Sequence, residues 1–493
     1  MTAIVHLEAL AKSGVTHRYS AIRNLVQVWV RENFTALRLD WHITPTESDD
    51  PTLAEKITRI SVVEIQGADE SNGIVLLANC KFEVHVYELR PSVSVNTISV
   101  DDAGTVASTV IDLPCRTLDG LWESLIFDDD IKHRLLHFMS TLMLFSSRKV
   151  NSNLVSCGRI ILLHGPPGTG KTSLCRAMAQ KLKIRLSRTF PDGKLVEISA
   201  HALFSKWFSE SGKLVGKLFE QIRELVQDER CLVFVLIDEI ESLTAARKAA
   251  VSGNEPSDAL RVVNAFLTEL DRLRDAKNVL ILTTSNLIDA MDSAFIDRVD
   301  IKQYVGYPST MAVYEILRSC MLELIRCRLV DTITHDSEHD LDFSADSPSS
   351  LSSSFTIESD DETDQDSGAQ TRTRVRCARK DTDSSEKLTF SASDTDETLP
   401  IDLLILPYTQ ASLALYSAPG ASSSRLLRIA QSCKSFGGRT LRRLVVLAHA
   451  KYIHREQCSL DELLDALQQI VSEEYELQLN AVRVQMQNTA VSL

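Results

Sequence analysis

One short stretch constrains the fold of this chain more than any other. It reads Gly-Pro-Pro-Gly-Thr-Gly-Lys-Thr and fills every fixed position of the phosphate-binding loop pattern G-x-x-x-x-G-K-[ST]. Its residues are Gly165, Pro166, Pro167, Gly168, Thr169, Gly170, Lys171 and Thr172. Residues 159–164 before the loop, with four consecutive apolar residues, predict a buried strand, and residues 173–182 after it predict a helix. This strand–loop–helix context predicts a nucleotide site in a parallel-sheet α/β domain.

The chemistry of the loop assigns roles to its residues. Glycines let backbone N–H groups approach a chain of phosphates, and the N-terminus of the following helix adds a partial positive charge. We expect Lys171 to reach the β- and γ-phosphates of ATP, and the hydroxyl of Thr172 to bind Mg²⁺. ATP and Mg²⁺ are therefore the predicted cofactors.

Two acidic residues follow a second apolar run. Residues 231–237 fit a central parallel strand that is buried on both faces, and Asp238 and Glu239 come directly after it. Open α/β sheets bind ligands at the carboxyl ends of their strands. We therefore expect Asp238 to join Thr172 around Mg²⁺, and Glu239 to activate the attacking water. The alternative is an ordinary helix start, where the helix dipole favours acidic residues.

Three more polar residues are candidates for the site. Asn286 follows residues 279–285, which predict another buried strand, and there its amide can sense the γ-phosphate or simply start a turn. Arg298 can stabilise a transferring phosphoryl group in a neighbouring subunit, with a surface salt bridge as the alternative. Arg439 stands at a predicted helix start, from which it can face a nucleotide held by the other subdomain.

Lys206, Trp207 and Phe208 stand at a helix boundary among polar residues. An exposed aromatic side chain there can grip a polypeptide without reading its sequence, because apolar contact needs no particular partner. Burial in the core is the alternative for these aromatic residues. The Leu118–Phe127 stretch also holds an aromatic candidate, since Trp122 can pack on the nucleotide base or belong to the core.

The chain divides into three predicted units and one insertion. Residues 1–105 predict a small α+β domain for recognising a substrate or adaptor, with a linker from Ser94 to Ser108. His85 is expected on the surface of a strand in that domain. Residues 110–308 predict the large α/β subdomain, and residues 309–493 predict a small helical lid. Within the lid, residues 335–399 are acidic and Ser-rich, which predicts a disordered insertion.

Composition narrows the function classes. A formal net charge of −14 argues against general coating of nucleic acid, so no direct nucleic-acid partner is expected. Ten cysteines are scattered without C-x-x-C or zinc spacing, which predicts reduced thiols in the nucleus or cytoplasm. The sequence has neither a signal-peptide core nor an apolar run of membrane-spanning length, so no membrane association is expected. The absence of H-E-x-x-H excludes a fused metalloprotease of that type.

These motifs, in this order, resemble those of the AAA+ ATPases. The chain is also similar to the pachytene checkpoint ATPase family over three longer stretches, residues 204–213, 234–247 and 300–304. The resemblance covers most of residues 110–330 and 424–460. It implies an AAA+ core with a helical lid behind a small N-terminal domain.

The resemblance also implies an activity. Members of the family form hexameric rings that use ATP to unfold part of HORMA-domain proteins of the spindle checkpoint and the meiotic chromosome axis, threading them through a central pore. Their N-terminal domain often recruits the substrate through a HORMA adaptor. Residue by residue, the resemblance makes Trp207 the pore-loop aromatic, Glu239 the Walker B glutamate, Asn286 sensor 1, Arg439 sensor 2 and Arg298 the arginine finger, the last at a shortened spacing.

Two other function classes are open to such a chain. A nucleotide-gated scaffold would bind partners without threading them, but it needs no activated water, so Glu239 argues against it. A nucleic-acid motor or clamp loader is disfavoured by the acidic balance.

Overall fold

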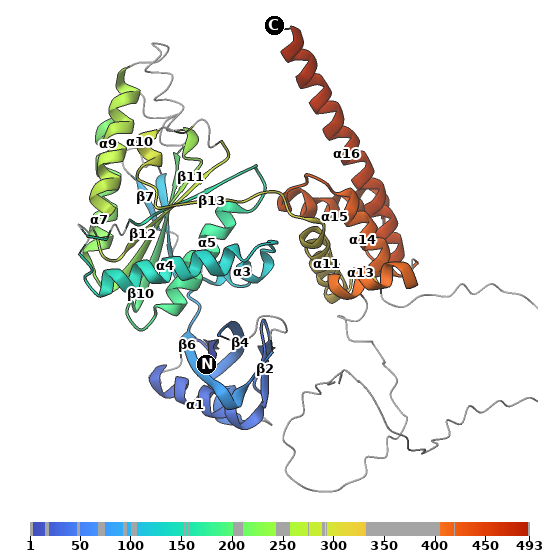
Figure 1. Ribbon diagram of the computed structural model, residues 1–493, viewed down its shortest axis with the longest axis horizontal. Helices are drawn as coiled ribbons and strands as arrows, with labels where there is room; N and C mark the ends of the chain where they lie inside the picture. Colours follow the sequence, from blue (N-terminus) through green and yellow to red (C-terminus); the bar gives the residue numbers. More distant parts are fainter. Residues whose placement is uncertain are drawn as a thin grey trace, which may run out of the picture.

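The computed structural model describes residues 3–331 and 405–491, apart from residues 15–18, 47–49, 68–73, 92–95, 100–105, 152–153, 156–157, 201–210, 243–256, 275, 288–290, 292 and 419. Figure 1 shows three units, which are an N-terminal domain, a large α/β subdomain and a helical lid. The predicted fold class is confirmed in all three. The insertion predicted for residues 335–399 lies outside the described residues.

The N-terminal domain is a four-stranded sheet, in the order β3-β4-β1-β6, with a helix on one face. Val5, Leu7 and Ala9 of the central strand pack in the same core as Val26 and Val30 of the helix, as the alternation of a strand requires. Strand β1 runs antiparallel to β4 and parallel to β6. The elements are β1 (Ala3–Ala11), α1 (Tyr19–Asn33), β2 (Ala36–Arg38), β3 (His42–Ile43), α2 (Pro51–Lys56), β4 (Ile57–Gln66), β5 (Ile74–Leu76) and β6 (Cys80–Tyr87).

His85 is buried, so its predicted surface position was wrong. Its strand face is covered, because the neighbouring Tyr87 packs against Ile184 of the large subdomain. The His85 ring lies beside His6 of β1, with Nδ1 of His6 3.2 Å from Nε2 of His85. Together with Glu83 the two rings bring three possible metal ligands close together, but the two nitrogens already stand at hydrogen-bond distance.

This histidine pair is expected to make the fold acid-sensitive. Burial lowers the pKa of His85 to about 3 from 6.5, and burial also lowers the pKa of His6. Between pH 6.5 and about pH 3, His85 binds a proton in the unfolded chain but not in the folded chain, so the free energy of unfolding decreases as the pH falls. We expect a loss of up to about 1.4 kcal/mol per pH unit for each histidine.

The variant His85→Asn tests this expectation by urea denaturation at pH 7.5 and pH 5. It is expected to lose less stability between the two pH values than the wild type loses. His454→Asn changes an exposed histidine and is expected to keep the wild-type pH dependence. Equal acid sensitivity in His85→Asn and the wild type would contradict the assignment.

The N-terminal domain is tied to the large subdomain by buried charges. Nζ of Lys181 lies 2.6 Å from Oε2 of Glu8 and 2.9 Å from Oε1 of Glu123. Burial lowers the pKa of Lys181, but these two carboxylates outweigh it and raise the pKa overall. Arg185 forms a second ion pair with Glu64. The domain is therefore anchored on α5 (Lys171–Arg185), the helix that begins at the phosphate-binding loop.

Lys181→Ala is expected to destabilise the protein by about 3–5 kcal/mol, because Glu8 would keep a buried charge without its main partner. The double variant Lys181→Met, Glu8→Leu removes both charges and is expected to recover most of the loss. Chemical denaturation measures both effects. A loss below about 1 kcal/mol in the single variant would show that this ion pair does not anchor the domain.

The large subdomain is built on a seven-stranded sheet in the order β13-β9-β12-β11-β10-β8-β7. The five strands from β13 to β10 are parallel, whereas β8 and β7 add an antiparallel edge. The linker predicted from Ser94 to Ser108 was therefore wrong, because β7 and β8 pair within this sheet. The strands are β7 (Asn96–Ser99), β8 (Val106–Asp112), β9 (Ile160–His164), β10 (Asp192–Ser199), β11 (Cys231–Asp238), β12 (Val279–Ser285) and β13 (Ile301–Tyr304).

Helices cover both faces of this sheet, so its central strands are buried throughout. Along β11, Val233 and Val235 pack in one core cluster, and Phe234 and Leu236 pack in the other. Helices α7 and α9 contribute to the first cluster, and helices α3, α4 and α5 contribute to the second. The helices of the large subdomain are α3 (Leu121–Ser124), α4 (Ile131–Ser147), α5, α7 (Ser211–Gln227), α9 (Ser257–Arg274) and α10 (Ser293–Ile296).

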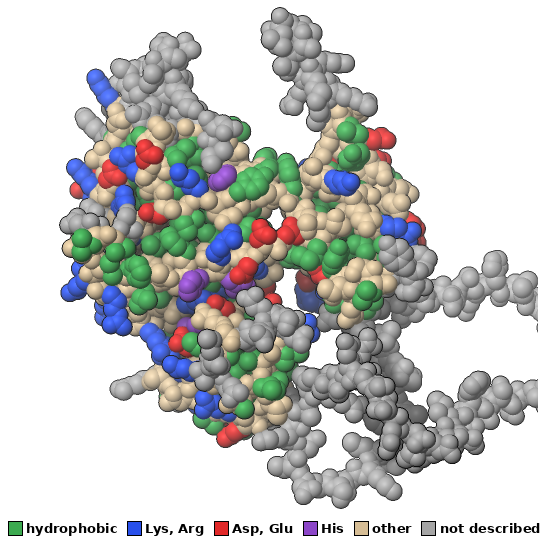
Figure 2. All heavy atoms as spheres, in the orientation of Figure 1, with side chains coloured by type: hydrophobic (Ala, Val, Ile, Leu, Met, Phe, Trp, Pro, Cys, Tyr) green, Lys and Arg blue, Asp and Glu red, His purple; other side chains and the backbone are tan. Residues whose placement is uncertain are grey.

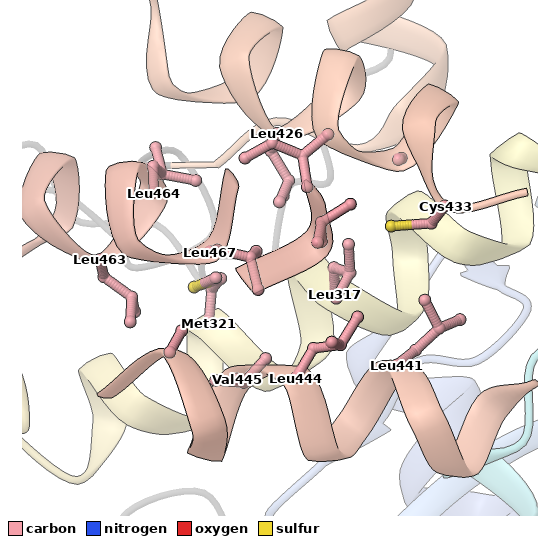
Figure 3. Packing of buried hydrophobic residues seen from close by; sticks show 14 of the residues in the cluster. Leu317, Met321, Leu426, Cys433, Leu441, Leu444, Val445, Leu463, Leu464 and Leu467 are labelled. Atoms are coloured by element: carbon pink, nitrogen blue, oxygen red, sulfur yellow. The ribbon is translucent and has the colours of Figure 1, made fainter. Parts of the chain in front are cut away.

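The lid is a helical unit with its own apolar core, shown in Figure 3. Leu317, Leu444 and Leu467 from three different helices are fully buried in it. A capping box begins the last helix, where the Glu462 backbone N–H donates to Oγ of Ser459 at 3.2 Å. The elements are α11 (Thr310–Arg326), β14 (Val330–Asp331), α13 (Tyr408–Ser417), α14 (Ser422–Ser432), α15 (Gly438–Tyr452), β15 (Cys458–Ser459) and α16 (Leu460–Val491). Of the helices described, none has the length and apolar character needed to span a membrane.

Candidate functional site

The predicted phosphate-binding loop joins the end of β9 to the start of α5. Gly165 has a φ of 144°, and a Cβ atom there would lie 2.2 Å from the carbonyl oxygen of Val305. Gly170 has a φ of 94° and precedes the first residue of α5. The left-handed backbone and the close approach admit only glycine at these two positions. The loop is thus a preformed backbone cradle at the N-terminus of a helix.

Lys171 is folded back onto the loop. Its Nζ donates to the carbonyl oxygens of Gly165 at 2.8 Å and Pro166 at 2.7 Å, and its side chain is buried. Burial lowers the pKa of Lys171, and the carboxylates of Glu241, Asp238 and Glu239 oppose this effect in that order. A desolvated ammonium group with acidic neighbours is well placed to bind an anionic phosphate.

Asp238 is the centre of a hydroxyl–carboxylate cluster. Thr172 donates from Oγ1 to Oδ1 of Asp238 at 2.9 Å, and Thr284 donates to the same oxygen. Oγ1 of Thr284 also accepts the backbone N–H of Glu239 at 3.2 Å. Glu239 itself has a φ of 57°, an unusual backbone conformation for a residue with a side chain. Thr284 therefore fixes the turn that presents both acidic residues, and no sequence motif had singled it out.

Asn286 lies beside the acidic turn, at the end of β12. Its backbone N–H and its Nδ2 both donate to Oε1 of Glu241, each at 3.0 Å. The side chain is therefore held by a carboxylate, as well as lining the cavity described next.

The lid closes over the loop and forms a cavity of about 580 Å³, within the usual range for ligand pockets. The backbone N–H of Arg439 donates to the carbonyl oxygen of Gly168 at 3.2 Å. A Cβ atom on Gly437 would lie 2.8 Å from that oxygen, so the approach requires glycine. Figure 2 shows acidic side chains beside the opening between the large subdomain and the lid. The predicted site residues that line the cavity are Pro167, Gly168, Thr169, Gly170, Lys171, Thr172, Asp238, Glu239, Asn286 and Arg439.

Sequence reasoning missed part of the cavity wall. Arg442, one helical turn beyond Arg439, lines the cavity and donates to the carbonyl oxygen of Ser124 at 2.5 Å. Its recurrence three residues after Arg439 on one helix was the signal that could have found it. Leu125 and Phe127 also line the cavity, whereas Trp122 is buried beside His133. For Trp122 the core alternative is therefore confirmed.

One predicted functional residue, Arg298, lies apart from this cavity, and one predicted element lies outside the described residues. Arg298 forms a two-pronged ion pair with Asp271, with Nε 2.8 Å from Oδ1 and Nη2 2.9 Å from Oδ2. Within the described part of the chain it is not among the residues that line the cavity. Lys206, Trp207 and Phe208 lie outside the described residues.

The arrangement has the groups that a nucleoside triphosphatase needs. The glycine cradle and Lys171 fit a chain of phosphates, and the oxygens of Thr172 and Asp238 are of the kind that Mg²⁺ prefers. Glu239 projects from the same edge of the sheet as a possible general base. Because the wall includes Arg439 and Arg442 of the lid, occupancy of the cavity can be linked to the position of the lid.

Three family models match separate parts of the chain. The model of the ATPase family associated with various cellular activities (AAA) matches residues 161–307. The TRIP13 N-terminal domain matches residues 1–92, and the TRIP13-like AAA+ ATPase lid C-terminal domain matches residues 406–475.

The chain is also similar to individual proteins from animals and a plant. The chain is 46% identical to the mouse (Mus musculus) pachytene checkpoint protein 2 homolog over 328 residues, which are 66% of this chain and 75% of the mouse protein. It is 48% identical to the homolog from Arabidopsis thaliana over 322 residues, 65% of this chain and 68% of that protein. The solved structure of C. elegans PCH-2 is similar with a TM-score of 0.63 at 29% identity, covering 96% of this chain and 99% of that one.

Proposed function

Because this chain belongs to the pachytene checkpoint protein 2 family of AAA ATPases, we propose that it uses ATP hydrolysis to unfold part of HORMA-domain proteins. In this proposal six copies form a ring, and the client chain passes through its central pore. The observation that carries the ATP-driven step is that Lys171, Asp238 and Glu239 of the large subdomain line the same cavity as Arg439 of the lid.

Each side chain of the cavity has a task in hydrolysis. Lys171 leaves the loop carbonyls to bind the terminal phosphates, and Arg439 approaches the same phosphates from the lid. Thr172 and Asp238 hold Mg²⁺, which neutralises phosphate charge. Glu239 takes a proton from the attacking water, and Asn286 orients that water against the γ-phosphate.

In the proposed ring, each ATP site receives an arginine from the neighbouring protomer. Arg298 is the proposed arginine finger for the site of the neighbouring protomer, where it stabilises the charge of the transferring phosphoryl group. For that role it has to exchange its ion pair with Asp271 for the phosphate. Assembly and hydrolysis are thereby coupled.

Movement of the lid would couple ATP hydrolysis to movement of the client chain. Arg439 and Arg442 connect the lid to the cavity, so nucleotide binding and release change the angle between the subdomains. Trp207, with Lys206 and Phe208, grips the client in the pore. The N-terminal domain recruits the client, in some cases through a HORMA adaptor, and its anchorage on α5 keeps it next to the ATPase core. We place this activity in the nucleus and cytoplasm, in checkpoint signalling and meiosis, with no direct nucleic-acid or membrane partner.

A trapping experiment tests the proposal against a nucleotide-gated scaffold and a nucleic-acid motor. Full-length Glu239→Gln protein is mixed with a purified HORMA-domain protein and a HORMA adaptor in ATP or ADP, and the complexes are separated by size-exclusion chromatography with mass measurement. We expect a hexamer that retains the client in ATP only. Equal client binding in ADP would favour the scaffold, and ATP turnover by the wild type that rises with DNA instead of client would favour the motor.

A further inference from the structure

Glu241 is a carboxylate of the acidic turn to which the sequence motifs assign no role. It follows Asp238 by three residues and is partly buried next to the end of β12. The turn that carries it is fixed to β12, because the backbone N–H of Ile240 donates to the carbonyl oxygen of Thr284 at 3.0 Å. Glu241 is not among the described residues that line the cavity, so it reaches the site through a neighbour.

That neighbour is Asn286. One oxygen of Glu241, Oε1, accepts both the backbone N–H and the side-chain Nδ2 of Asn286, each at 3.0 Å. A carboxylate can only accept hydrogen bonds, so this contact determines which end of the Asn286 amide faces Glu241. The second N–H of Nδ2 and the carbonyl oxygen Oδ1 then remain for the cavity that Asn286 lines.

Glu241 also acts on the phosphate-binding lysine. Burial lowers the pKa of Lys171, and among the carboxylates that counteract this effect Glu241 is the strongest, ahead of Asp238 and Glu239. Glu241 therefore acts on two residues that line the cavity, on Asn286 through hydrogen bonds and on Lys171 through its charge.

We propose that Glu241 is a positioning residue for ATP hydrolysis, which holds the Asn286 amide in the orientation that addresses the γ-phosphate and the attacking water. The inference rests on the proposed role of Asn286 in hydrolysis. Glu241 touches neither substrate nor metal in this role. Loss of the Glu241 carboxylate frees the Asn286 side chain to rotate. This rotation reduces the stabilisation of the transition state more than it reduces the affinity for ATP.

Steady-state ATPase kinetics of the full-length protein test the inference. Glu241→Ala is expected to lower kcat about 10- to 100-fold, the range for losing a hydrogen bond to a charged group, with KM for ATP within about twofold. Glu241→Gln keeps an oxygen that can accept both bonds and is expected to retain most of kcat. Glu241→Asp keeps the charge but loses the reach, so it is expected to behave like Glu241→Ala. Glu229→Ala, an exposed control, is expected to match the wild type.

A double-mutant cycle with Asn286→Ala separates positioning from a structural role. In the Asn286→Ala background, Glu241→Ala is expected to have almost no further effect on kcat, because the side chain that it positions is gone. Equal losses in both backgrounds, or a Glu241→Asp protein with wild-type kcat, would overturn the inference. An Asn286→Ala protein that hydrolyses ATP at the wild-type rate would reject the role of Asn286 itself. Retained client trapping by Glu239→Gln would show that such a failure concerns Asn286 and Glu241 alone.

Discussion

Glu239→Gln is expected to lower the kcat of ATP hydrolysis by about 100-fold or more while leaving the affinity for ATP within about threefold. Glutamine matches the size of glutamate but cannot accept a proton from water. The backbone contact between Glu239 and Thr284 does not involve the carboxylate, so the turn is expected to remain in place. Lys171 and the glycine cradle, which are proposed to bind the phosphates, are unchanged.

Steady-state turnover and the binding of a fluorescent ATP analogue measure the two quantities separately. Glu229→Gln changes an exposed glutamate of the same subdomain and serves as the matched control, with wild-type values expected for both. A Glu239→Gln protein that turns over ATP within about twofold of the wild-type rate would remove the general-base role from Glu239.

Trp207→Ala is expected to abolish client remodelling while the protein still forms a ring and hydrolyses ATP. The proposed grip depends on the apolar area of the indole ring, and a residue of this size contributes most of the contact in such a grip. Trp207 has no proposed part in ATP binding or hydrolysis, so basal ATP turnover is expected to stay within about threefold of the wild type.

Trp207→Phe is the control for this prediction, because phenylalanine keeps an aromatic ring at the same position. It is expected to retain a large part of the remodelling rate, which is followed by protease sensitivity of a purified HORMA-domain client. If Trp207→Ala remodels the client as fast as the wild type does, the client is not gripped by this residue.

The core of the large subdomain could be predicted from the sequence because its signals are local. β9 and β11 each contain a continuous apolar run that leads into a complete loop motif or an acidic pair, and β12 begins with the apolar residues 279–282. The geometry brings Lys171, Asp238 and Asn286 to one cavity, as their positions at the ends of parallel strands implied. Arg439 of the lid lines the same cavity, as its predicted helix start implied.

The errors concern residues whose environment is made by distant parts of the chain. β1 was not predicted, although it is the strand between β4 and β6, and the polar β7 was interpreted as a linker. β7 is not distinguished by its own residues, because pairing with neighbours far along the chain determines it, whereas β1 has an alternating pattern at Val5, Leu7 and Ala9 that was overlooked. His85 was assigned to the surface for the same reason, since packing between two domains covers its face of the sheet.

Contacts within the site were equally hidden from sequence patterns. Glu241 and Asn286 are 45 residues apart, and nothing in either sequence context pairs them. Arg298 was a candidate from the sequence, but its ion pair with Asp271 joins the turn after α10 to α9, 27 residues earlier in the chain. Sequence patterns are read in short windows, so contacts between residues this far apart can be identified only once the fold is known.

The central claim is that ATP hydrolysis by this chain changes the conformation of a HORMA-domain protein. Hydrogen exchange of a purified client, followed over time with catalytic amounts of the full-length protein, ATP and a HORMA adaptor, measures it directly. We predict that client amides lose protection with the wild type in ATP, and remain protected with Glu239→Gln or in ADP. Rapid ATP hydrolysis by the wild type with no change in client protection would contradict the account.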